Sequence, residues 1–104
     1  MLQAATTAQM MINGETRTSL EQDIKLQLAL TKAIEVIGEA ASKITAETRT
    51  TFPQIPWLGV IGMRNVLIHA YFNIDLDKLW ETATSDLPPL IVQLEEISLS
   101  MNID

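Results

Sequence analysis

Residue types that often carry chemistry are scarce in this 104-residue chain. Cysteine is absent, and histidine and tyrosine occur once each, as His69 and Tyr71. The lack of cysteine excludes disulfides, thiolate metal sites and cysteine nucleophiles. A single histidine argues against a zinc site built within one chain. We therefore expect neither a metal nor another cofactor.

The chain also lacks long apolar runs and an excess of basic charge. No run approaches the ~18–20 apolar residues of a membrane helix. Residues 1–12 lack the basic start and cleavage site of a signal peptide, so we expect a cytoplasmic protein that binds no membrane. The formal net charge is −6. Residues 75–104 carry seven acids and one base, Lys78, whereas residues 1–74 carry six of each. Any nucleic-acid contact should therefore be local and should avoid this acidic segment.

The residues that are abundant suit one packed helical domain over residues 1–104. Hydrophobic residues make up 47% of the chain, which is enough for one core at this length. No segment alternates at period two over the length of a strand, whereas several have apolar residues spaced by three and four. We expect an all-α fold, a compact bundle of four or five helices joined by short turns.

In the first half of the chain, helix ends are predicted from capping and turn residues. A short first helix should stop at Asn13-Gly14. Ser19 with Gln22 predicts a capping box at the start of a helix that reaches about Ile44. Residues 45–51 are helix-competent up to the following prolines.

In the second half, prolines and one aspartate mark the boundaries. A helix is predicted from about Trp57 through the region of His69. Asp75 should cap a further helix. Pro88-Pro89 should kink or restart that helix before it continues through Ile97.

Residues 64–71, Arg64-Asn65-Val66-Leu67-Ile68-His69-Ala70-Tyr71, place four polar side chains inside an apolar run. On a straight helix, Arg64 and Tyr71 lie within ~20° of each other, whereas His69 is rotated by ~140° from Arg64. Either the helix ends near His69, or a second copy supplies groups across a two-fold axis. Gly59 and Gly62 would let two such helices cross closely, so both arrangements stay open.

These residue types permit a recognisable reaction. Histidine accepts and donates a proton near neutral pH, and arginine suits phosphate. Together they suffice for metal-independent RNA cleavage, in which a base deprotonates the ribose 2′-hydroxyl and an acid protonates the leaving 5′-oxygen. Arginine would stabilise the charge that develops on the phosphate. One histidine per chain is too few for separate base and acid, but two chains supply two.

Simpler interpretations exist for each residue. A lone histidine in an apolar helix is more often a hydrogen-bonded structural residue than a catalyst. Arg64 could form an ion pair, for instance with Glu39. Tyr71 could lie at the edge of the core with its hydroxyl group in water.

An ordered series of short motifs resembles the HepT-like toxins of the HEPN superfamily, over roughly residues 20–97. The motifs are Ile37-Gly38-Glu39-Ala40, Ile55-Pro56-Trp57, Gly62-Met63-Arg64-Asn65, Ile68-His69-Ala70-Tyr71-Phe72, Asp75-Leu76 and Leu79-Trp80. Each motif alone is weak, but the ordered series is specific. By this resemblance, residues 1–13 lack the opening turns of a first helix that is usually longer.

The resemblance implies a toxin of a toxin–antitoxin system that acts as an endoribonuclease. It implies a homodimer or higher even oligomer, with the Arg-x4-His-x-Tyr motifs of both chains at the dimer cleft. His69 would be the acid or base, and Arg64 would bind phosphate and stabilise the transition state. Asn65 would orient the reacting groups. A cognate minimal nucleotidyltransferase antitoxin would transfer AMP to Tyr71. The attached phosphate would place negative charge where the scissile phosphate binds.

Two other hypotheses remain. The chain could be a non-catalytic HEPN-like module that binds a nucleotide or a nucleotidyltransferase, with Arg64 and His69 holding a phosphate. It could also be a helical dimerisation domain with a structural histidine. Only the toxin hypothesis requires that expression of the chain alone slow growth.

Overall fold

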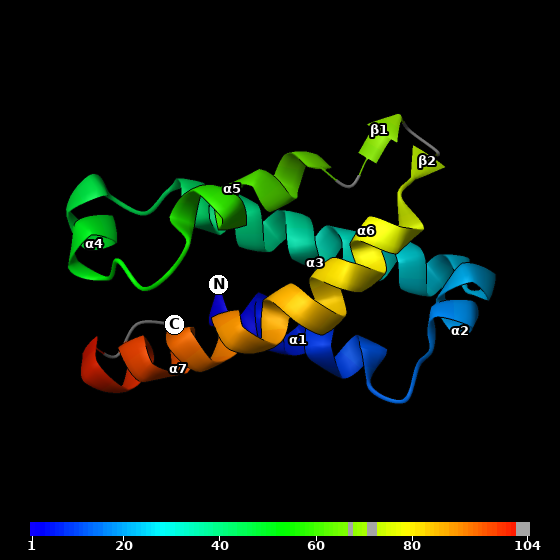
Figure 1. Ribbon diagram of the computed structural model, residues 1–104, viewed down its shortest axis with the longest axis horizontal. Coiled ribbons are helices and arrows are strands. Elements are labelled where there is room, and N and C mark those ends of the chain that lie inside the picture. Colours follow the sequence, from blue (N-terminus) through cyan, green and yellow to red (C-terminus); the bar gives the residue numbers. More distant parts are fainter. Residues whose placement is uncertain (67, 71–72, 102–104) are drawn as a thin grey trace.

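The computed structural model describes residues 1–66, 68–70 and 73–101, and the side chains of residues 1–63 and 74–99. Most of these residues are helical, which confirms the all-α prediction (Figure 1). The elements in chain order are α1 (Leu2–Ile12), α2 (Arg17–Gln22), α3 (Ile24–Ser42), α4 (Ala46–Thr51), α5 (Trp57–Val66), β1 (Ile68–Ala70), β2 (Asn73–Ile74), α6 (Leu76–Glu81), the π-helical η1 (Thr82–Asp86) and α7 (Leu87–Met101).

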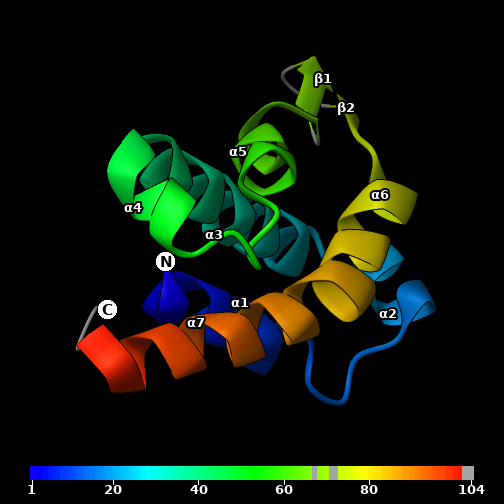
Figure 2. The ribbon, with the colours of Figure 1, turned by 60° about the vertical axis from the view of Figure 1, so that its left-hand side comes forward.

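Helix α3 contacts more of the other elements than any other helix does, namely α1, α2, α5 and α6. Helices α1 and α5 both pack against it, and α7 lies along α1 (Figures 1 and 2). Helix α4 lies at the opposite end of the molecule from α2 (Figure 1). The principal extents are 41 × 28 × 17 Å. The bundle is therefore flattened, about as thick as two packed helices.

The core follows the apolar spacing of α3. Leu30, Ile34 and Ile37 are fully buried, and so are Ile55 before α5 and Leu79 in α6. Leucine and isoleucine at steps of three and four bury one face of a helix, so the long α3 supplies the centre of the core. Within the described part of the chain, no helix is both long enough and apolar enough to span a membrane.

The predicted capping box lies three residues earlier than expected. Thr16 is the N-cap of α2: its hydroxyl accepts a bond of 3.0 Å from the Ser19 N–H, and its own N–H donates to the Ser19 hydroxyl at 2.7 Å. The prediction that Ser19 and Gln22 form the box is therefore wrong. Asp23 caps α3 instead, accepting from the Leu26 N–H at 3.0 Å.

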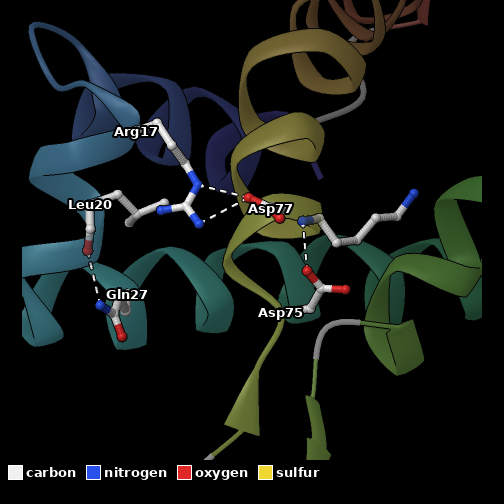
Figure 3. A network of polar contacts seen from close by, with 6 residues as sticks. Arg17, Leu20, Gln27, Asp75 and Asp77 are labelled. Carbon is white, nitrogen blue, oxygen red and sulfur yellow. Dashed lines mark hydrogen bonds and ion pairs between the residues drawn. The ribbon is translucent and has the colours of Figure 1, made fainter.

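The contact between α2 and α6 brings distant parts of the chain together. Arg17 donates from Nε and Nη2 to Oδ1 of Asp77 at 3.0 and 2.9 Å (Figure 3). Gln27 of α3 donates to the Leu20 carbonyl at 2.9 Å, which also fixes the end of α2 (Figure 3). Asp75 caps α6 by accepting from the Lys78 N–H at 3.0 Å, which confirms its predicted role.

The predicted interruption at Pro88-Pro89 takes the form of a widened turn. Residues 82–86 are π-helical, and the Leu87 N–H donates to the Thr82 carbonyl five residues earlier. Prolines lack the N–H that an α-helix needs, and their rings collide with the carbonyl four residues back. The wider turn precedes the prolines, which lie at the start of α7.

The helix predicted through the region of His69 is shorter than expected. Helix α5 ends at Val66, and β1 pairs in an antiparallel manner with β2, with Ile68 opposite Ile74. Extended pairing requires φ and ψ angles that a helix cannot have. Strands of three and two residues are also too short for a period-two pattern to reveal, so they were not predicted from the sequence.

Candidate active site and adjoining cleft

The residues predicted to carry chemistry fall on two consecutive elements. Arg64 and Asn65 belong to the last turn of α5, and His69 is the middle residue of β1. Their side chains, and the whole of Tyr71, lie outside the described residues. The roles assigned to these four residues therefore stay predictions. The end of α5 at Val66 corresponds to the first of the two arrangements that the sequence left open.

The start of α5 is fixed firmly against the core. Trp57 donates from its indole Nε1 to the Phe52 carbonyl at 2.9 Å, across the turn that contains the two prolines. The Val60 N–H donates to the Pro56 carbonyl at 3.0 Å, and the Val60 side chain is buried. Because α5 packs along α3, Arg64 lies on a helix that is held against the core.

A cleft of about 530 Å³ lies beside α5. Residues 56–63 form one side, and residues of α6, η1 and the first turns of α7 form the other. A Cβ atom on Gly59 or Gly62 would meet no atom within 4 Å. The sequence led to the expectation that these glycines admit a crossing helix. Within the described chain they border open space instead.

The cleft carries charged and neutral polar groups. Lys78 of α6 and Asp86 of η1 both line it, and neither forms an ion pair with another described side chain. Gln93 of α7 donates from Nε2 to the Gln54 carbonyl at 3.0 Å, which leaves its amide oxygen free to accept. The hydroxyl-bearing Ser85 lies between these groups along the chain. The cleft therefore offers a cation, an anion and neutral hydrogen-bonding groups.

The residues on the far side of this cleft were not predicted from the sequence. Two signals were present. Lys78 is the single base among residues 75–104, and residues 82–86 are a polar run directly before two prolines. Neither signal shows that these residues face α5, because that depends on packing between segments about 20 residues apart. Among the described residues, no group of three or more His, Asp or Glu side chains could hold a metal ion.

Comparisons with known proteins point to one family. The profile described as "Ribonuclease HepT-like" matches residues 1–97. A Thermococcus cleftensis protein named "Probable ribonuclease HepT" is 41% identical over 75 residues, which cover 72% of this chain and 68% of that protein. A Methanocaldococcus jannaschii protein named as a candidate RNase is 40% identical over 70 residues, or 67% of this chain and 64% of that protein.

A third relative extends the match along the chain. A protein of Caldanaerobacter subterraneus subsp. tengcongensis, also named as a candidate RNase, is 34% identical over 86 residues. That match covers 83% of this chain and 77% of the relative. The chain thus spans about two thirds of the length of the first two relatives. No solved structure matches it significantly.

Proposed function

Because the chain belongs to the HepT-like ribonuclease family, we propose that it is the toxin of a toxin–antitoxin system and cleaves RNA without a metal. The family match over residues 1–97 carries this proposal. Within that range the sequence keeps Arg64, Asn65, His69 and Tyr71 in the order and spacing of the Arg-x4-His-x-Tyr motif. Residues 1–104 form a single HEPN-like domain in this proposal.

The proposed reaction needs two copies of the chain. His69 of one copy removes the proton from the ribose 2′-hydroxyl, whose oxygen then attacks the adjacent phosphorus atom. His69 of the second copy protonates the 5′-oxygen as its bond to phosphorus breaks, which leaves a cyclic phosphate. Arg64 stabilises the extra negative charge on the phosphate oxygens, and Asn65 orients the reacting groups. A homodimer, or a higher even oligomer, is therefore the active form.

Control of the toxin is proposed to act on Tyr71. A cognate minimal nucleotidyltransferase transfers AMP from ATP to the tyrosine hydroxyl and releases pyrophosphate. Tyr71 follows His69 by two residues, so the added phosphate and adenosine lie beside the catalytic groups. Negative charge there repels the scissile phosphate of an RNA strand and blocks its binding.

The catalytic part is tested with His69→Ala. We expect loss of RNA cleavage and of growth inhibition, because the proposed reaction takes both its base and its acid from His69 side chains. Far-ultraviolet circular dichroism should match that of the wild type. Val92→Ala, an exposed position on α7, serves as a control that should keep full cleavage. Full cleavage by folded His69→Ala would contradict the proposed mechanism.

The regulatory part is tested by intact mass spectrometry after co-expression with the cognate nucleotidyltransferase. We expect a mass increase of one or more AMP units that is absent in Tyr71→Phe. The unmodified chain, expressed alone, should slow growth. An unmodified mass together with normal growth would instead favour a non-catalytic module that binds a nucleotide or the nucleotidyltransferase.

A further inference from the structure

The cleft beside α5 adjoins the predicted catalytic motif. Gly62 and Met63 line the cleft, and Arg64 and Asn65 follow them directly on the same helix. At 1.5 Å of rise per residue, the Cα atom of Arg64 lies only about 3 Å further along the helix axis than that of Gly62. A group bound in the cleft would therefore lie next to the backbone that carries the motif.

The size of the cleft fits a small ligand better than a packed helix. Its volume of about 530 Å³ falls within the roughly 300–1,000 Å³ typical of small-molecule sites. Gly59 and Gly62 let a ligand approach the α5 backbone closely. The exposed Pro56 and Pro89 give the walls apolar surface, and Met63 adds a polarisable sulfur that suits contact with an aromatic ring.

The charges of the cleft suit a nucleotide. Lys78 is half-buried, lines the cleft and has no ion-pair partner among the described side chains, and an ammonium group of this kind binds phosphate. Asp86, Ser85 and the free amide oxygen of Gln93 can bond with ribose hydroxyls or with the edge of a base. A single-stranded RNA offers an unstacked base, a ribose and a phosphate together.

A second copy of the chain fits the cleft less well. Charged residues are depleted at the centres of protein interfaces, and burying Lys78 and Asp86 without partners would be costly. RNA bound in the cleft would contact the acidic C-terminal segment, although the charge distribution of the sequence predicts that RNA avoids it. The single base of that segment is the one that lies beside α5.

We propose that the cleft between α5 and the segment η1–α7 binds one nucleotide of the single-stranded RNA, adjacent to the cleavage point. The base lies between the apolar walls near Met63, and its phosphate contacts Lys78. This assignment rests on the ribonuclease function proposed above. In this assignment, the cleft residues of one chain determine which nucleotide lies next to the cleaved bond.

The cleft is tested by filling it. Gly62→Leu extends a side chain into the space where a Cβ atom meets no neighbour, so α5 should still fold. We expect kcat/KM for cleavage of a single-stranded RNA to fall about tenfold or more, because the nucleotide loses its site. Gly59→Leu provides a second variant with the same expectation. Leu58→Phe enlarges an exposed residue of α5 outside the cleft and should change kcat/KM less than about twofold.

Lysine variants test the phosphate contact. Lys78→Met should weaken the binding of a 2′-O-methyl RNA oligonucleotide, which cannot be cleaved, and should lower the salt dependence of log K by about 0.7. Lys25→Met removes an equal charge from the start of α3, outside the cleft. It should leave the salt dependence unchanged, and equal effects of the two variants would overturn the assignment.

The remaining outcomes separate this assignment from the proposed function. Wild-type rates in folded Gly62→Leu would overturn it. So would a change from dimer to monomer in Gly62→Leu, measured by light scattering, because the cleft would then be a subunit interface. If the wild type cleaves no RNA, the proposed function fails. Titration of amide resonances with the 2′-O-methyl oligonucleotide then decides: shifts in residues 82–86 support the cleft, and their absence overturns it.

Discussion

Ile37 and Val36 are neighbours on α3 with opposite surroundings. Ile37 is fully buried in the core, whereas Val36 is 42% exposed. Ile37→Ala should lower the free energy of unfolding by about 2–5 kcal/mol, because it removes buried methyl groups and leaves a cavity. Val36→Ala should change it by less than about 1 kcal/mol. Urea denaturation of both variants measures the difference, and equal losses would contradict this assignment of the core face.

The role of a single residue could be predicted where its hydrogen-bond partner is close to it in the sequence. Asp75 could be recognised as a cap because its bond reaches only three residues along the chain. The capping box before α3 was misplaced because Thr16, Ser19 and Asp23 can all act as caps. Thr16 caps α2 and Asp23 caps α3, each through a bond to a backbone N–H three residues on. The three candidates lie within eight residues, so the pattern of capping residues alone does not choose among them.

Replacing either of two glycines with alanine should change the stability of the protein, in opposite directions, because one glycine follows a helix and the other lies within one. Gly14, after α1, has φ +81°, whereas Gly59 lies in helix α5 with open space around its missing Cβ. Gly14→Ala should destabilise the protein by about 1 kcal/mol, because an L side chain is strained at that φ. Gly59→Ala should stabilise it by about 0.5–1 kcal/mol through helix propensity. Thermal unfolding followed by circular dichroism measures both, and shifts of the same sign would contradict the prediction.

Secondary-structure elements could be predicted from the sequence where they are long and their apolar residues recur with a helical period. Apolar residues spaced by three and four predicted the helix that reaches about Ile44, and the motif order predicted the family. The strands β1 and β2 were missed, since two or three residues carry no measurable period. The far side of the cleft was missed because Lys78 and Asp86 meet α5 only through tertiary packing.

At the scale of the whole molecule, the two-copy reaction makes a quantitative prediction. If each cut needs His69 from both chains, mixed dimers with one His69→Ala chain are inactive. An equal mixture, allowed to exchange subunits, should then retain about a quarter of the activity of the same total amount of wild type, and not half. Initial rates of RNA cleavage measured across a series of mixing ratios give the curve. A linear dependence on the wild-type fraction would show that each chain acts alone.

The central place of α3 also bears on how the protein unfolds. Helices α1, α2, α5 and α6 each pack against α3, so neither half of the flattened bundle can open without exposing its apolar stripe. Partial opening would expose much of the buried apolar surface but would regain only part of the conformational entropy of the chain. Helices α1, α2, α3, α5 and α6 should therefore unfold as one cooperative unit. Amide protons of α3 should exchange with solvent only through global unfolding, and more slowly than those near the ends of α1 and α7.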